Sequence, residues 1–203
     1  MKKLRQVQSS RRGFSLAETL IAMLIMSFVG IIVTVGMMTA LSVYGRITDQ
    51  ANAELLLSTT LIEMRDELDR AEEVKVITNA EDGCIVYYRF SDGNWRKLSN
   101  KENDHKGIYL SYLSGYNTQN PQGLSPAKDT EGNVIAPQLL VSSAAASKKL
   151  YAQFGGIDYS NGFFTVTDLK VYDSKTKVGG QDKELSSLDS YRIRSLSRVN
   201  HIT

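Results

Sequence analysis

Residues 13–20 read Gly-Phe-Ser-Leu-Ala-Glu-Thr-Leu, and they are the most informative part of the sequence. It places one carboxylate, Glu18, directly before 27 residues, Thr19–Gly45, that carry no formal charge. A helix needs about 20 apolar residues to cross a hydrocarbon layer about 30 Å thick. The run is longer than that and is dominated by Leu, Ile, Met, Val and Phe. We therefore expect a membrane-spanning helix with an acidic residue at its N-terminal end.

The charges around the apolar run predict its orientation. The first 13 residues carry five basic side chains and no acid, whereas the rest of the chain has 19 basic and 22 acidic side chains. Because basic flanks stay in the cytoplasm, we expect a cytoplasmic N-terminus and an exported C-terminus. The positive net charge of +2 therefore comes from the first 13 residues, which we call the leader. It gives no reason to expect that the rest of the chain binds nucleic acid. A cleavable secretory signal is the alternative, but its apolar region should be only about 7–15 residues long.

Glu18 has two compatible interpretations. Ser15-Leu16-Ala17-Glu18 fits the capping box, in which the serine caps the helix and the glutamate binds a free backbone N–H. That interpretation needs no function, but it does not explain an acid beside the bilayer core. If the leader were cut after Gly13, the new amino group of Phe14 could pair with the Glu18 carboxylate of a neighbouring chain. The cap and an assembly role are therefore compatible.

Beyond Gly45 the helical pattern becomes one-sided. Charged residues now separate the apolar ones, and no proline occurs from Ser15 to Glu73. We therefore expect the helix to continue in amphipathic form over residues 46–73 and to bury an apolar stripe against a folded domain. The residues expected in that stripe are Ile47, Ala51, Leu55, Leu61, Ile62, Leu68 and Ala71.

Residues 74–203 carry the signals of strands and turns and are long enough for one exported domain. We expect four to six antiparallel strands packed on the helix, which makes the chain an α+β protein. The expected strands are 84–90 and 94–98, joined as a hairpin through Ser91-Asp92-Gly93, then 107–113, 163–172 and 191–199.

Two polar stretches are expected to connect these strands. Residues 174–190 have Gly179-Gly180 as a turn. Residues 114–137 contain all three prolines and are expected to form a long loop, either functional or simply mobile.

No arrangement of side chains predicts an enzyme, a metal site or a cofactor. The histidines, His105 and His201, lie in polar surroundings, and no phosphate-binding loop or nucleophile elbow occurs. Residues 129–133 superficially resemble a calcium loop but lack its spacing, so an ordinary turn is favoured. Cys84 is the single cysteine, which excludes an intramolecular disulfide, and it is expected to be a small buried apolar side chain.

Three arginines near the C-terminus also have two possible interpretations. Arg192, Arg194 and Arg198 share one face of an expected strand, beside Tyr191 and before His201. Basic and aromatic residues together can hold single-stranded DNA. Charges on a strand edge also deter edge-to-edge pairing, and this structural role is favoured.

Residues 11–20, Arg-Arg-Gly-Phe-Ser-Leu-Ala-Glu-Thr-Leu, closely resemble the processing signal of type IV pilins and of the pilin-like subunits of type II secretion and DNA-uptake machines. The likeness covers roughly residues 11–45. It implies that a prepilin peptidase cuts after Gly13, that Phe14 becomes N-methylphenylalanine, and that Glu18 is needed for assembly with other subunits. It also implies a helix that first anchors the subunit in the cytoplasmic membrane, at an assembly platform, and later packs in a cell-surface or periplasmic filament.

The sequence departs from many major pilins in two places. It has no proline partway along the apolar helix and no C-terminal cysteine pair. The expected organisation is a removed leader at 1–13, an assembly helix at 14–45, its amphipathic continuation at 46–73 and an exported domain at 74–203. A minor pilin is favoured. A pseudopilin of secretion or DNA uptake, or an anchored surface-binding domain that never polymerises, remain the alternatives.

Overall fold

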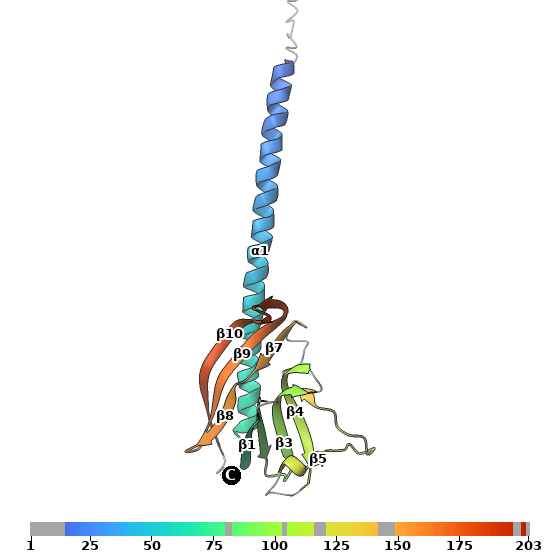
Figure 1. The fold of residues 1–203 in the computed structure, drawn as a ribbon, viewed down its shortest axis with the longest axis vertical. Helices are drawn as coiled ribbons and strands as arrows, with labels where there is room; N and C mark the ends of the chain where they lie inside the picture. Colours follow the sequence, from blue (N-terminus) through green and yellow to red (C-terminus); the bar gives the residue numbers. More distant parts are fainter. Residues whose placement is uncertain are drawn as a thin grey trace, which may run out of the picture. The chain divides into compact units, whose positions relative to one another are not determined.

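The computed structural model describes residues 15–79, 83–102, 105–115, 121–141, 149–196 and 200–201. The chain divides into two compact units, Met1–Ile47 and Thr48–Thr203. A single helix, α1 (Leu16–Leu68), supplies all described structure of the first unit beyond Ser15 and continues into the second (Figure 1).

The helix ends at Leu68, five residues before the expected boundary at Glu73. The Arg70 guanidinium donates to the carbonyl of Asp66 at 2.9 Å and so satisfies one of the acceptors that a helix end leaves open. The Glu72 N–H then donates to the carbonyl of Arg89 at 2.8 Å, which starts the sheet. Neither contact has a local sequence signal such as Gly or Pro, and this explains why the pattern overestimates the length of the helix.

The first sheet has seven strands, in the order β11-β1-β2-β3-β4-β5, with β6 also paired to β4. All its described pairings are antiparallel except that of β1 with β11. Its strands are β1 (Glu73–Asn79), β2 (Gly83–Arg89), β3 (Trp95–Glu102), β4 (His105–Ser114), β5 (Ser125–Pro126), β6 (Gln138–Leu139) and β11 (Asn200–His201). The short 3₁₀ helix η1 (Pro121–Gly123) precedes β5.

The second sheet has four strands, in the order β10-β9-β7, with β8 also paired to β9. They are β7 (Leu150–Gln153), β8 (Gly156–Ser160), β9 (Phe163–Val178) and β10 (Gln181–Arg194). Figure 1 shows the two sheets on different sides of the lower part of α1. One hydrophobic core joins them, because buried residues of α1 and of both sheets belong to the same cluster. The expected α+β fold, a long helix packed on antiparallel sheets, is confirmed.

The predicted hairpin of residues 84–98 is confirmed as β2–β3. Gly93 has a φ of 81° and its N–H donates to the carbonyl of Phe90 at 3.0 Å, so the turn uses a conformation that favours glycine. The predicted strands at 107–113 and 163–172 are confirmed as parts of β4 and β9.

The expectation of four to six strands is wrong, because the described residues form eleven strands in two sheets. The polar segment 174–190 is not a connection. It forms the arms of the long β9–β10 hairpin, in which Gly179 and Gly180, with φ of 61° and 85°, make the predicted two-residue turn. Strand pairing satisfies much of its backbone while most of its polar side chains remain exposed, so composition alone could not identify it.

The face of α1 that packs against the sheets differs from the predicted stripe. Ala53, Leu56, Thr60, Met64 and Leu68 are buried, at spacings of three and four residues. Leu68 and Ala71 of the predicted stripe are buried and Leu61 is half-buried, but Ile47, Ala51, Leu55 and Ile62 are exposed. The buried face was difficult to recognise in the sequence because it includes a polar residue, Thr60. The Thr60 hydroxyl donates to the Leu56 carbonyl at 2.7 Å, so its hydrogen-bonding capacity is satisfied within the core.

Candidate functional site

Ser15 and Glu18 form the predicted capping box at the start of α1. The Glu18 N–H donates to Ser15 Oγ at 3.2 Å, and the Ser15 N–H donates to Glu18 Oε2 at 3.1 Å. The two residues thus satisfy each other's backbone donors where the helix has no internal partners for them. An ionised carboxylate has about four acceptor positions, so one hydrogen bond leaves capacity for a cation.

The predicted processing residues, Gly13 and Phe14, lie outside the described residues. Their assignment as the cleavage position and the methylated residue stays a prediction. Glu18 is described, and it lies four residues after Phe14 in the sequence.

The first unit presents an apolar surface. Its large hydrophobic side chains between Leu16 and Ile47 are exposed in the isolated chain, and α1 contains a segment long and apolar enough to cross a membrane. Hydroxyl groups within the segment are satisfied by the helix itself, as shown by Ser27, Thr34 and Thr39, which each donate to the carbonyl four residues earlier. Such internal satisfaction is what a lipid environment requires.

The remaining candidates from the sequence, Asp129, Cys84 and the two histidines, lie in a turn, in the core and in strands of the fold. Asp129 Oδ1 accepts from the N–H groups of Glu131 and Asn133 at 2.9 Å each, which is the geometry of a polar turn. Cys84 is buried in the core, as expected. His105 lies in β4 and His201 in β11, on strands at different places in the first sheet.

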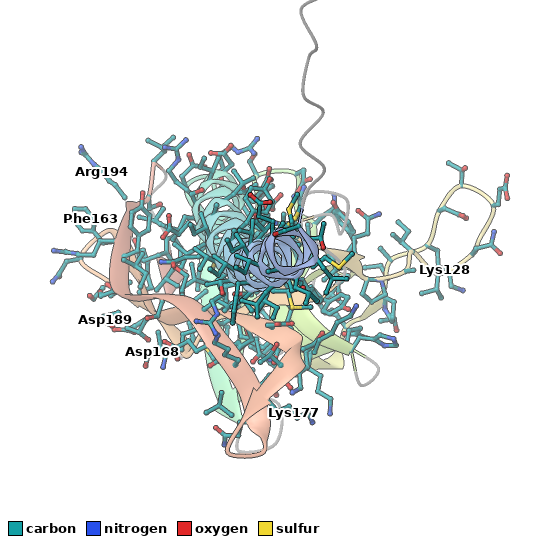
Figure 2. The ribbon with its side chains drawn as sticks, turned by 90° about the horizontal axis from the view of Figure 1, so that it is seen from above. Lys128, Phe163, Asp168, Lys177, Asp189 and Arg194 are labelled. Atoms are coloured by element: carbon teal, nitrogen blue, oxygen red, sulfur yellow. The ribbon has the colours of Figure 1, made fainter. Side chains whose placement is uncertain are left out.

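Two of the three arginines lie on β10, which is an edge strand of the second sheet. The Arg192 guanidinium lies 4.4 Å from the centre of the Phe163 ring, so that ring already has a cationic partner. Figure 2 shows Arg194 and Phe163 on the same side of the molecule. Arg198 lies outside the described residues, so the described structure does not bring the three arginines together. Protection of the strand edge against edge-to-edge pairing stays the favoured prediction for these arginines.

The second unit contains a pocket of about 500 Å³ that the sequence did not predict. Leu56 of α1, Ile108 of β4 and Leu150 of β7 contribute to its apolar part, while Lys106, Lys149, Lys177 and Asp182 are its charged residues. Asp182 Oδ2 accepts from Lys106 Nζ at 2.8 Å and from the Tyr151 hydroxyl at 2.7 Å. These hydrogen bonds lower the pKa of Asp182, and they tie β10 to β4 and β7.

We expect Asp182 to titrate below its ordinary value of 3.8. Because the folded-state pKa is lowered, the stabilisation is present above that value and is lost as the pH falls through the lowered pKa. Carboxyl NMR titration of the fragment 48–203 should place the midpoint below 3.8, and Lys106→Ala should raise it. Lys183→Ala is the matched control and should leave it unchanged. A wild-type midpoint at or above 3.8 would refute these hydrogen bonds of Asp182 with Lys106 and Tyr151.

Comparison with known families supports the interpretation of the N-terminal segment. The family described as the prokaryotic N-terminal methylation motif matches residues 8–34. No curated protein and no solved structure matches the chain. The matched residues include Gly13, Phe14 and Glu18 and the first half of the apolar segment of α1. This motif on a long apolar helix that is followed by antiparallel sheets supports a type IV pilin-like protein.

Proposed function

We propose that the chain is a minor subunit of a type IV pilus-like filament. In this proposal the N-terminus is cytoplasmic and the second unit is exported. A prepilin peptidase cuts between Gly13 and Phe14, and Phe14 is then N-methylated. The subunit leaves the membrane at an assembly platform and joins other pilin subunits as a structural component rather than an enzyme. The absence of a mid-helix proline and of a C-terminal cysteine pair favours a minor over a major pilin.

The observation that carries the proposal is the position of Glu18. Its carboxylate lies in the first turn of α1, directly before the 27 uncharged residues Thr19–Gly45. An acid at the middle of a membrane costs about 2.5–3.5 kcal/mol, and less near the edge. Cleavage after Gly13 would create an ammonium group at Phe14. Pairing of that group with Glu18 of a neighbouring subunit would neutralise both charges in apolar surroundings.

The exposed face of α1 in the second unit supports packing between subunits. Leu55 and Ile62 are seven residues apart, so they lie on one face of the helix, and both are more than half exposed. Met64 lies nine residues from Leu55, which is two and a half turns, and is fully buried. The helix therefore has an inner face that packs on its own sheets and an outer face on which Leu55 and Ile62 are exposed, and a neighbouring helix would cover these two side chains.

Replacing Gly13 by valine is expected to stop removal of the leader. Glycine allows close approach of the backbone to an enzyme, and a branched side chain beside the bond to be cut would obstruct it. Immunoblots of cells that contain a prepilin peptidase should show shortened wild-type protein and full-length Gly13→Val. Ser10→Val is the matched control inside the leader and should be shortened normally. Normal shortening of Gly13→Val would count against cleavage at this position.

A further inference from the structure

The β9–β10 hairpin has a basic tip, defined here as residues 174–183. Beyond Asp173 the described pairing of β9 is with β10 alone, because β7 pairs with β9 only up to that residue. Lys175, Lys177 and Lys183 are exposed on the tip, and Val178 beside the glycine turn is 65% exposed. The tip thus carries three exposed cations and one exposed apolar side chain.

The acidic residues of this region are engaged by the protein itself. Asp173 accepts from the Lys175 N–H at 2.9 Å and from the Thr176 hydroxyl at 2.7 Å. Asp182 accepts from Lys106 and Tyr151. Glu184, which directly follows the tip, has its carboxylate 3.6 Å from Lys170 Nζ. Because all three carboxylates have partners within the chain, the exposed lysines give the tip a positive charge.

The base of the tip is fixed beside the start of the second unit. The Ser174 N–H and hydroxyl donate to the carbonyl of Lys149 at 2.7 and 2.9 Å. Lys149 Nζ in turn lies 2.6 Å from Asp49 Oδ1 on α1. Asp49 follows Gly45, the last residue of the uncharged segment, by four residues, or about 6 Å of helix. Along the chain, only three residues therefore separate the uncharged segment from the helix residue that fixes the base of the tip.

We propose that the hairpin tip binds the headgroups of anionic phospholipids at the surface of the membrane that anchors α1. Lysine side chains near an anionic bilayer are attracted by its surface potential over about a Debye length. The exposed Val178 of the same tip is suited to the interface between headgroups and hydrocarbon. The contact would hold the second unit against the membrane before assembly. It rests on the membrane-anchored state of the proposed function but not on processing or polymerisation.

The test uses the full chain reconstituted in nanodiscs of phosphatidylcholine, with or without phosphatidylglycerol. A fluorophore on Val178→Cys reports proximity to lipids that carry a headgroup quencher, and the buried Cys84 should escape labelling. We expect stronger quenching in the anionic discs and its loss as salt concentration rises. Equal quenching in neutral and anionic discs would overturn the proposal.

The charge-reversed variant Lys177→Glu/Lys183→Glu identifies the surface responsible. It should lower the ratio of docked to free tip by about tenfold or more, since each lysine contributes roughly a factor of five. The control, Lys128→Glu/Arg194→Glu, changes the net charge equally, and Figure 2 shows Lys128 and Arg194 on sides of the molecule away from Lys177. Unchanged quenching in the tip variant, or an equal loss in the control, would refute tip docking. Protection of the label that needs two chains in one disc would instead identify a neighbouring subunit as the partner.

Discussion

Replacing Glu18 by glutamine is expected to leave leader removal intact and to lower incorporation into filaments at least tenfold. Removing one partner of a buried ion pair costs about 3–5 kcal/mol, and 1.4 kcal/mol already corresponds to a factor of ten. The shallow position of Glu18 reduces this cost, so tenfold is the lower bound. The measurement is the ratio of subunit in sheared filaments to subunit in membranes, with the leader state followed on the same blots.

Variants of the capping box separate the charge from the cap. Glutamine can still accept from the Ser15 N–H, so Glu18→Gln keeps the cap and loses the charge. Ser15→Ala keeps the charge and removes the acceptor for the Glu18 N–H, which costs about 0.5–2 kcal/mol at the helix end. We expect Ser15→Ala to assemble nearly normally and Glu18→Ala to fail as Glu18→Gln does. Normal incorporation of Glu18→Gln would show that Glu18 serves only as a cap.

Replacing Glu67 by alanine is expected to destabilise the second unit by about 3 kcal/mol. Glu67 Oε2 accepts from Arg96 at 2.9 Å and from the Tyr88 hydroxyl at 2.8 Å, and the two ion-pair partners are less than one-fifth exposed. The contact joins the last turn of α1 to β2 and β3. Without Glu67, Arg96 keeps its contact with the Phe90 ring, at 4.1 Å, but loses this carboxylate. Urea unfolding of the fragment 48–203 measures the loss.

Two control variants make this stability prediction specific. Glu63→Ala removes an exposed glutamate from the same helix and should change the free energy of unfolding by less than about 0.5 kcal/mol. Glu67→Gln keeps an acceptor for Tyr88 without the charge and should give an intermediate loss. If Glu67→Ala were no more destabilising than Glu63→Ala, the ion pair would not join the helix to the sheet.

Features set by neighbouring residues could be predicted from the sequence. The capping box needs only Ser15 and Glu18, and the β2–β3 and β9–β10 turns need only their glycines. A further hairpin was missed although its signal was present. Asn161-Gly162, with φ of 52° and 82°, joins β8 to β9, and Asn-Gly is a strong signal for this turn.

Features set by distant residues could not be predicted. The buried face of α1 is chosen by two sheets, and outward-facing Leu55 and Ile62 resemble core residues in any local pattern. Lys149 and Asp49, which fix the base of the hairpin tip, are 100 residues apart in the chain. The capping box was predictable because its two residues are neighbours in the sequence, whereas the pocket and the hairpin tip depend on tertiary packing.

Intact-mass measurement with N-terminal sequencing of the wild-type chain, purified from membranes that contain a prepilin peptidase, tests the central claim most directly. That claim is that a newly formed amino group at Phe14 is available to pair with Glu18. We predict a chain that begins at Phe14 with one methyl group on its nitrogen. A chain that still begins at Met1, or one that begins after the apolar run because a secretory signal was removed, would contradict the claim.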